Sequence, residues 1–424
     1  MVIFRRDTSS HLLYSSAYSL FRRAPSFRLD KIYYAVYGSG LGHVTRVTEV
    51  SRLVKRKKDY VARFSCSDQA LEYLRSHGER GESIVEGPAL DVEWTADGSF
   101  SSSEFIPRFP FMLNTFLKQV QFEAENISKF DPKIVVSDSK LSPVLSTLRL
   151  KTKPPIITIL NQFKVTLPPR FKAGRPLSSI YERFAGDVLG LLWSLSDEVL
   201  MTDLPPPYTI GESNVSGSDV SNIVKYVGFI SPSLELSEGS LNKATQTLDI
   251  DDRKALAFFQ ISGPEVTKKR FVDIVLGSCR NLCKRYNVVI SMGHSSGSGE
   301  PRRLSSGAWL YEWCPIKDEL FVLSSIIVAR SGHRTMGECI DAGKPAVLIP
   351  IHNHPEQLGN AEKFSKLGLG IEIKSENLRN ENLEESVDAC INDPSYGKNA
   401  KRLMSISKRY NGMEKVAEII QSYR

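Results

Sequence analysis

Short apolar runs alternate with stretches of helical spacing along most of the chain. The clearest case begins at residues 326–329, a β-branched run of the length typical of a buried parallel strand. Small residues at 331–332 then predict a tight turn, and apolar positions recur at helical spacing over 333–343. A second apolar run, 346–351, follows at once. The pattern predicts one strand, helix, strand unit of a parallel sheet.

The same alternation fills the rest of the chain. Residues 31–37 predict a strand, and 45–56 predict a helix after a glycine-rich turn. Other runs predict strands at 61–67, 134–136, 156–160, 196–202, 225–230, 255–261, 287–293, 309–310 and 369–374, and helices at 266–285, 383–391 and 394–422. We therefore expect an α/β protein with two Rossmann-like parallel-sheet domains facing a central cleft.

Composition suggests where these domains begin and end. Residues 231–247 are polar without apolar periodicity, which predicts a linker between a first domain at 31–230 and a second beginning at 248. Residues 1–30 are rich in Ser and Arg and are expected to lie outside the fold. A transit peptide, a surface-binding amphipathic helix and a start codon placed too early all remain open for them.

Charge and cysteine usage narrow the class of protein. The net charge is +7, with local excesses of +3 in residues 1–30 and +5 in 398–424. These suit an anionic membrane surface or an acidic ligand, although a solvated basic face is the commoner explanation. No apolar run approaches the roughly 18 residues of a membrane span. Six scattered cysteines predict free thiols in a reducing compartment. We expect a cytoplasmic protein, with peripheral contact at the inner face of the membrane left open.

The turn after residue 329 carries the first candidate chemistry. Free N–H groups and the positive end of a helix favour a phosphate there. Glu338 follows one turn into the helix, where a carboxylate can accept bonds from a vicinal diol, and Glu356 with Gln357 lies just past the next strand. The alternative is an ordinary βαβ unit with polar loops.

This run resembles the donor-binding signature of GT-B nucleotide-sugar glycosyltransferases, such as the peptidoglycan-precursor N-acetylglucosaminyltransferase and the plant and antibiotic UDP-sugar transferases. The resemblance implies that Glu338 binds ribose and that Glu356 and Gln357 bind the sugar. It also implies a last segment, 403–424, that crosses from a donor domain at 248–402 back to the first domain. The implied diphosphate ligands are Ser331, Gly332, His333, Arg334 and Thr335, with Ser262 and Gly263 in a second phosphate loop and Trp313 and Cys314 at the uracil.

A glycine-rich turn, GSGLGHVTR at 38–46, follows the first predicted strand. It nearly spells a dinucleotide fingerprint but has His43 at the third glycine, and Asp68 comes late for a ribose ligand. The turn resembles the loop that opens the acceptor domain of the same glycosyltransferases. That resemblance places the following residues on the acceptor side: Gly40, Gly42, Arg46, Asn161 and Gln162.

His43 is the candidate catalytic base. Transfer of a sugar to a hydroxyl needs a proton acceptor, and a neutral imidazole serves near physiological pH. Asp138 ends a predicted strand 138 − 43 = 95 residues later, and in plant-type members an aspartate at this distance pairs with the histidine. The competing interpretation is that Asp138 caps a helix beginning near Leu141.

Aromatic residues between these points bear on the acceptor. Residues 91–117 mix aromatics with Gly, Ser and Pro, which predicts a long loop leading into a helix: Trp94, Phe100, Phe105, Phe109 and Phe111. Exposed aromatics would suit a lipid-linked acceptor, whereas a small satellite core is an equal alternative.

We expect no metal and no organic cofactor. Asp249 and Asp251 match the DxD motif of another glycosyltransferase fold, but their place before a strand favours a cap. Cys279 and Cys283 stand at helical spacing far from a histidine, which favours packing.

The sequence therefore predicts an inverting, metal-independent glycosyltransferase that uses a UDP-sugar and a hydroxyl acceptor, with no nucleic-acid partner. A non-hydrolysing UDP-sugar epimerase and a non-catalytic GT-B partner subunit remain as alternatives.

Overall fold

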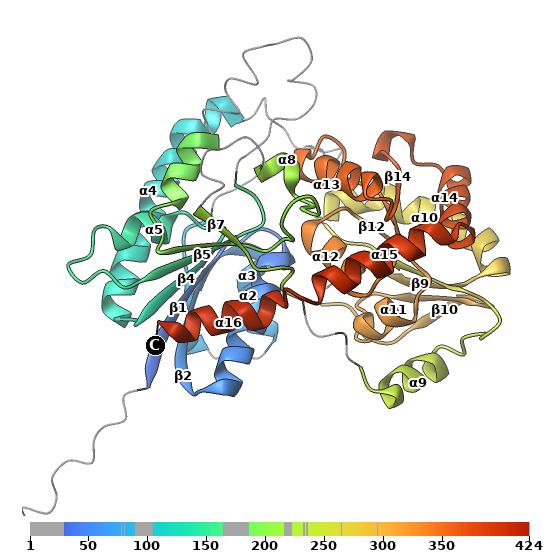
Figure 1. Ribbon diagram of the computed structural model, residues 1–424, viewed down its shortest axis with the longest axis horizontal. Helices are drawn as coiled ribbons and strands as arrows, with labels where there is room; N and C mark the ends of the chain where they lie inside the picture. Colours follow the sequence, from blue (N-terminus) through green and yellow to red (C-terminus); the bar gives the residue numbers. More distant parts are fainter. Residues whose placement is uncertain are drawn as a thin grey trace, which may run out of the picture.

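A computed structural model describes residues 29–423, apart from 78, 80, 90–104, 164–185, 216–222, 232–233, 235, 264 and 295. In this part of the chain two seven-stranded sheets stand side by side with helices around them (Figure 1). We call the sheet of β1 to β7 with its helices the N-terminal lobe, and the sheet of β8 to β14 with its helices the C-terminal lobe.

The sheet of the N-terminal lobe has the order β3-β2-β1-β4-β5-β6-β7, and every pairing in it is parallel. Its strands are β1 (Asp30–Val36), β2 (Tyr60–Cys66), β3 (Ile84–Glu86), β4 (Ile134–Asp138), β5 (Ile156–Leu160), β6 (Glu198–Met201) and β7 (Val224–Tyr226). Its helices include α2 (Leu41–Lys57), α3 (Asp68–Ser76), α4 (Phe105–Phe130), α5 (Ser142–Thr147) and α8 (Glu212–Val215).

The sheet of the C-terminal lobe has the order β10-β11-β9-β8-β12-β13-β14 and is parallel except at the edge strand β10. Its strands are β8 (Leu256–Gln260), β9 (Asn287–Ser291), β10 (Arg302–Ser305), β11 (Ala308–Tyr311), β12 (Ile326–Ala329), β13 (Ala346–Leu348) and β14 (Gly370–Glu372). Its helices include α9 (Glu238–Thr247), α10 (Glu265–Arg285), α11 (Lys317–Leu323), α12 (His333–Asp341), α13 (Pro355–Lys366), α14 (Asn380–Asn392) and α15 (Pro394–Ser407), and the last helix of the chain is α16 (Gly412–Ser422).

Apolar layers on both faces of each sheet hold the lobes together. The central strands β4, β5 and β12 are buried at every position, as expected where helices cover both faces of a parallel sheet. Alternate residues of β12 enter different layers: Ile327 and Ala329 pack with Met336 of α12, whereas Ile326 and Val328 pack with the residues of α10. The predicted two-sheet α/β class is confirmed.

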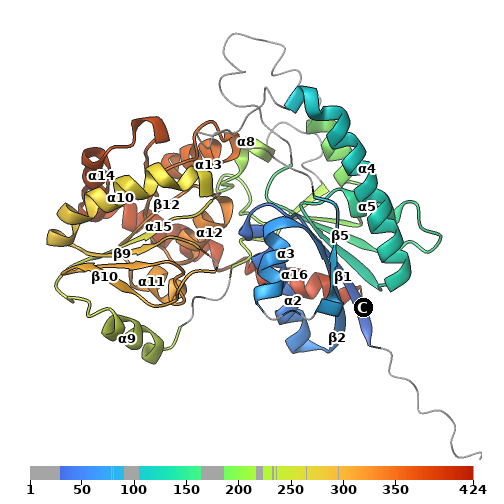
Figure 2. The ribbon, with the colours of Figure 1, turned by 180° about the vertical axis from the view of Figure 1, so that it is seen from behind.

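The chain passes between the lobes a second time near its C-terminus. Helix α15 packs in the C-terminal lobe through Ala400 and Leu403, whereas α16 packs against α2 through Val416, Ala417 and Ile420. Figure 2 shows α16 beside α2 from behind. Asn411, in the left-handed conformation at φ 42°, separates the two helices.

Three boundaries differ from the sequence prediction. Helix α2 begins at Leu41 rather than near residue 45. Residues 238–247 of the expected linker form α9, because the Ser237 hydroxyl caps its first turn and Ala244 buries on the C-terminal lobe. The boundary expected at 402 falls inside α15, whose Leu403 belongs to the core of the C-terminal lobe.

Candidate active site at the boundary between the lobes

Helix α12 begins directly behind the central strand of the C-terminal lobe. Strand β12 lies between β8 and β13, and Gly332 is the N-cap residue of the helix. Among the described residues, no side chain caps this end, and a Cβ added at Gly332 would meet no atom within 4 Å. The N–H groups of the first turn, from His333 to Thr335, have no partner within the helix, and the positive end of the helix lies behind them. This geometry suits an anionic group.

Two side chains expected to bind the donor instead brace the loops around that turn. The Ser331 hydroxyl donates to the backbone oxygen of Gln357 at 2.8 Å, and the Gln357 Oε1 accepts from the N–H of Ile351 at 3.0 Å. Asn360 Nδ2 donates to the Ser331 oxygen at 3.3 Å. These bonds fix the start of α12 against the start of α13, and none of them uses the N–H groups of residues 333–335.

Glu338 lies one turn into α12 and is held by two cations. Lys317 Nζ and Arg334 Nε donate to its Oε1 at 2.7 and 3.1 Å, and its side chain is only 4% exposed. Burial alone would raise the pKa of Glu338, but Lys317 and Arg334 outweigh it and hold the pKa below its ordinary value. Glu338 is therefore an ionised acceptor whose Oε2 receives neither of these two bonds.

Arg334 also joins the two lobes. Its Nη2 donates to Glu49 Oε1 and Oε2 of α2 at 3.0 and 3.1 Å. Glu49 lies six residues after His43 on the same helix, and neither it nor Lys317 was a sequence candidate. Spacing along α2 could not have indicated Glu49, because six residues do not return the helix to the face of His43, and its partner Arg334 is 285 residues away.

Two further predicted residues bond across the boundary. His333 Nε2 lies 3.0 Å from Asp203 Oδ2, and that carboxylate also accepts from the N–H groups of Leu204, Ile210 and Gly211. Glu356 Oε1 accepts from Asn161 Nδ2 at 3.1 Å, and Gln162 follows half-buried. The loops after β5, β6, β12 and β13 thus meet at their carboxyl ends.

His43 and Asp138 are brought together as the sequence spacing suggested. His43 Nδ1 lies 2.7 Å from Asp138 Oδ1, and the aspartate is fully buried while the imidazole is 20% exposed. Helix α5 begins at Ser142 with Leu141 as its N-cap residue and no side-chain capping bond. Asp138 therefore contacts His43 and does not cap that helix.

The surroundings of His43 differ from expectation in two ways. It lies within the first turn of α2 rather than on the preceding loop, because the helix begins at Leu41 after N-cap Gly40, whose φ of 82° suits glycine. Arg46, expected to face the acceptor, is 6% exposed and points at Asp138. A Cβ added at Gly42 would lie 3.9 Å from the Cβ of Arg334, so the first turns of α2 and α12 face each other.

The remaining donor candidates occupy different environments. Trp313 is partly exposed, and its ring lies edge-on to His77 of the N-terminal lobe at 6.3 Å. The Cys314 side chain is 6% exposed in the core, where burial raises its pKa to about 12, so its thiol does not face a ligand. Ser262 is partly exposed, and Gly263, at φ 103°, makes the turn before α10.

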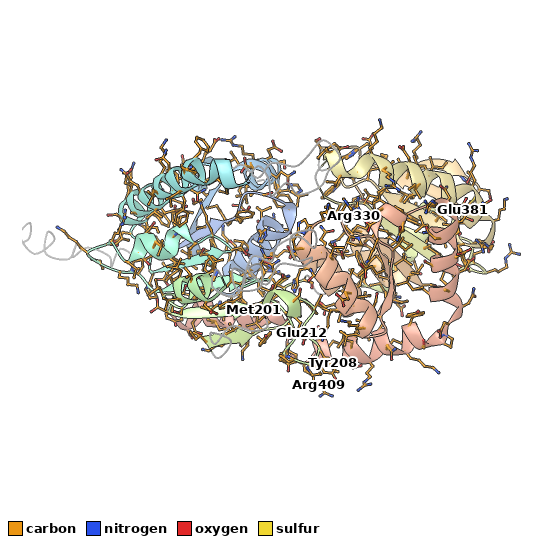
Figure 3. The ribbon with its side chains drawn as sticks, turned by 90° about the horizontal axis from the view of Figure 1, so that it is seen from above. Met201, Tyr208, Glu212, Arg330, Glu381 and Arg409 are labelled. Carbon is orange, nitrogen blue, oxygen red and sulfur yellow. The ribbon has the colours of Figure 1, made fainter. Side chains whose placement is uncertain are left out.

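A buried arginine at the end of β12 connects the loops near the candidate site with α10. Arg330, labelled in Figure 3, is 5% exposed and donates to the backbone oxygens of Ile349 and Thr267 at 3.1 and 2.8 Å. It packs over the ring of Phe271 at 4.7 Å. Its guanidinium thereby ties the loops after β12 and β13 to α10.

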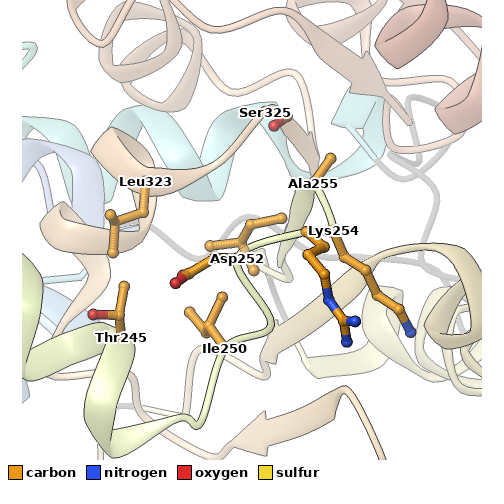
Figure 4. Close-up of a pocket in the computed structure, with 9 residues that line it drawn as sticks. Thr245, Ile250, Asp252, Lys254, Ala255, Leu323 and Ser325 are labelled. Carbon is orange, nitrogen blue, oxygen red and sulfur yellow. The ribbon is translucent and has the colours of Figure 1, made fainter.

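One pocket of about 310 Å³ lies elsewhere. Ala255, Leu256 and Ser325 line it at the amino ends of β8 and β12, together with Thr245 and Ile250 (Figure 4). Gly332 follows the carboxyl end of β12, at the opposite end of the strands, so the pocket is separate from the candidate site.

The described residues show neither a metal-binding cluster nor a membrane-spanning helix. Over the described residues, no cluster of three or more His, Cys, Asp or Glu side chains is arranged to hold a metal ion. In the same part of the chain, no helix has the length and apolarity to cross a membrane.

Cys279 and Cys283 are buried in the core, and Asp251 accepts from the Arg253 N–H as a turn cap. Trp94 and Phe100 of the aromatic stretch lie outside the described residues, and Phe111 is exposed.

Comparison with known proteins agrees with this arrangement. Residues 266–417 match the family model of the glycosyltransferase family 28 C-terminal domain. An uncharacterized glycosyltransferase of Methanopyrus kandleri is 25% identical over 309 residues, which are 72% of this chain and 81% of that protein. A UDP-N-acetylglucosamine–N-acetylmuramyl-(pentapeptide) pyrophosphoryl-undecaprenol N-acetylglucosamine transferase of Clostridium botulinum is 25% identical over 193 residues, 45% of this chain and 53% of that enzyme.

Solved structures show the same fold. The glycotransferase of kitacinnamycin superposes with a TM-score of 0.62 at 17% identity, covering 93% of this chain and 99% of that one. The chain thus has the GT-B fold of these glycosyltransferases. The match to the glycosyltransferase family 28 C-terminal domain begins in α10 and ends in α16.

Proposed function

We propose that the protein transfers a hexosyl or N-acetylhexosaminyl group from a UDP-sugar to a hydroxyl acceptor, with inversion at the anomeric carbon and without a metal ion. The observation that carries the proposal is the facing of two helix starts: the His43 and Asp138 pair at the start of α2, and the uncapped turn at the start of α12.

The chemistry assigns a role to each half-site. As the acceptor oxygen attacks the anomeric carbon, its proton passes to His43 Nε2, and the bond between the anomeric carbon and the diphosphate oxygen breaks. Attack from the face opposite the leaving group inverts the configuration. The negative charge that remains on UDP is stabilised by the N–H groups of residues 333–335.

The donor contacts follow from the same geometry. Glu338 would accept bonds from the ribose hydroxyls through Oε2, and Glu356 would contact the sugar beside Asn161. The charge of Arg334 is already shared between Glu49 and Glu338. Within the described residues its Nη1 is buried without a hydrogen-bond partner, so we assign that group to a diphosphate oxygen.

The acceptor that we propose is a hydroxyl compound with an apolar portion. The relative from Clostridium botulinum is named for a lipid-linked acceptor, a pyrophosphoryl-undecaprenol. The exposed side chains of Phe111, Leu113 and Leu117 on α4 would suit an acceptor with an apolar portion, bound with the protein peripheral to the inner face of the membrane.

Donor turnover tests this proposal. The protein is incubated with a panel of UDP- and dTDP-sugars, and the release of nucleoside diphosphate is followed by chromatography. We expect slow hydrolysis of at least one UDP-sugar, reduced about 100-fold or more in His43→Ala. His352→Ala, which removes a partly exposed histidine paired with Glu376, should retain the release. Unchanged release in His43→Ala would remove that residue from the mechanism, and an epimerised UDP-sugar without release would favour an epimerase.

A further inference from the structure

Arg46 is a buried cation that grips the carboxylate beside His43. Its Nε donates to Asp138 Oδ2 at 2.7 Å and its Nη2 donates to Asp138 Oδ1 at 2.6 Å. On its other side, Nη1 donates to Thr202 Oγ1 at 3.1 Å, just past β6. The two parallel bonds form the fork geometry that arginine provides and lysine does not. Arg46 thus joins α2, β4 and the end of β6 through one guanidinium group.

The shared oxygen determines which imidazole nitrogen carries the proton. Asp138 Oδ1 accepts from Arg46 Nη2 and lies 2.7 Å from His43 Nδ1. Because an ionised carboxylate only accepts, Nδ1 must carry the hydrogen of that bond, and the lone pair of the neutral ring is left on Nε2. Arg46 Nη2, itself a donor, lies 3.2 Å from Nδ1 and so cannot bond to it. The bonds of Asp138 therefore select one tautomer.

Arg46 also determines the charge around the ring. Full burial would raise the pKa of Asp138, but Arg46 and the bond from His43 lower it below its ordinary value. Tyr37, whose ring lies 5.4 Å from that of His43, stays neutral because burial raises its pKa. Across the boundary, Arg334 is paired with Glu49 and Glu338. Arg46 is thus a cation beside the imidazole whose removal changes the local charge.

We propose that Arg46 is a positioning residue for the base: it fixes Asp138, selects the His43 tautomer with its lone pair on Nε2, and holds a positive charge beside the ring. This inference rests on the proposed function, in which His43 accepts the proton of the hydroxyl. It goes beyond that function by assigning Arg46 to the catalytic pair instead of to the acceptor.

The first experiment is a pH titration of the full-length protein. The imidazole signals of ¹⁵N-histidine-labelled wild type, Arg46→Met and Arg46→Lys are followed by NMR, with His43 assigned from its loss in His43→Asn. Removing the cation makes protonation of the ring easier, so we expect its midpoint to rise by about one pH unit in Arg46→Met. Arg46→Lys, which keeps the charge but not the fork, should show less than half of that shift. An unchanged midpoint in Arg46→Met overturns the inference.

Kinetics supply a second readout with the UDP-sugar that is turned over. The acid limb of kcat/KM against pH should move to higher pH in Arg46→Met by the same amount as the NMR midpoint, while the affinity for UDP is unchanged. A uniform loss of rate at every pH would indicate a merely structural role. If no UDP-sugar is turned over by the wild type, the proposed function fails, and the NMR titration still tests the arrangement of Arg46, Asp138 and His43.

Stability measurements keep the inference testable if Arg46→Met folds poorly. That variant leaves the buried Asp138 without its fork, whereas Arg46→Met combined with Asp138→Asn removes both charges. We expect the denaturant midpoint of the double variant to recover toward that of Asp138→Asn alone. Additive losses in this double-mutant cycle would show that Arg46 does not act through Asp138.

Discussion

Buried carboxylates dominate the candidate site at the scale of single residues. Asp138 and Glu338 lie on opposite sides of the boundary, and each is held by two basic side chains. Both pKa values are lowered, so the stabilising charge is present at neutral pH and is lost as the pH falls through the folded-state values. Both carboxylates are therefore ionised at neutral pH although they are buried.

Glu338→Gln tests the donor side of this arrangement. The amide keeps the shape but loses the charge that attracts the ribose hydroxyls, so the affinity for UDP should fall about 10-fold, the range of a hydrogen bond to a charged group. Isothermal titration calorimetry measures it. Glu362→Gln on the exposed surface of α13, where Glu362 pairs with Lys366, is the matched control. Equal UDP affinity in Glu338→Gln and wild type would contradict the ribose assignment.

Sequence spacing could predict the pairing of His43 with Asp138, because the resemblance to plant-type glycosyltransferases includes that distance. It could not predict the direction of Arg46. With the helix placed near residue 45, His43 stood on a loop, whereas the start at Leu41 makes it a neighbour of Arg46 at i, i+3. The resemblance had placed Arg46 on the acceptor side, and the helix start predicted near residue 45 gave no reason to pair it with His43.

Helix α12 is the element on which the donor side depends. Gly337, at its centre, faces Phe229, which lies on the first connection between the lobes, and an added Cβ would come within 2.7 Å of the Phe229 ring. The close approach lets α12 pack directly against that connection. The strand before α12 and the helix itself could be predicted from periodicity, but this requirement for glycine could not, because Phe229 is far away in sequence.

Gly337→Ala tests this packing. Helix propensity favours alanine by about 1 kcal/mol, but overpacking against Phe229 costs about 1–3 kcal/mol, so we expect a net loss of stability of about 1 kcal/mol in urea unfolding. Gly397→Ala in α15 is the matched control, since its Cβ would meet no atom within 4 Å and should stabilise the protein slightly. Stabilisation in both variants would contradict this prediction, because it would show that the Phe229 side chain moves aside at little energetic cost.

The two passages between the lobes organise the whole molecule. Both converge on the C-terminal end of α12, where Asp341 accepts from the hydroxyls of Ser231 on the first passage and Ser407 at the end of α15, each at 2.6 Å. Gly412 approaches Gly228 so closely that an added Cβ would lie 2.5 Å from the Gly228 oxygen. The two-sheet architecture could be predicted from alternation, but this convergence depends on contacts between residues far apart in the chain.

Asp341→Asn should change how stability depends on pH. Burial raises the pKa of Asp341 to about 6, against an ordinary value of 3.8. A raised folded-state pKa gives stability that is full below about pH 4 and is lost as the pH rises through about 6, by about 3 kcal/mol. Thermal unfolding should therefore show Asp341→Asn more stable than wild type at pH 8 but not at pH 4. A difference that is the same at both pH values would contradict this account.

A crystal structure of the protein with UDP tests the central claim most directly. We predict the diphosphate within hydrogen-bond distance of the N–H groups of residues 333–335, the ribose beside Glu338, and His43 Nε2 directed across the boundary toward the leaving phosphate. UDP bound at another place, such as the pocket lined by Ile250 and Ser325, or a His43 ring turned away from the nucleotide, would contradict the account.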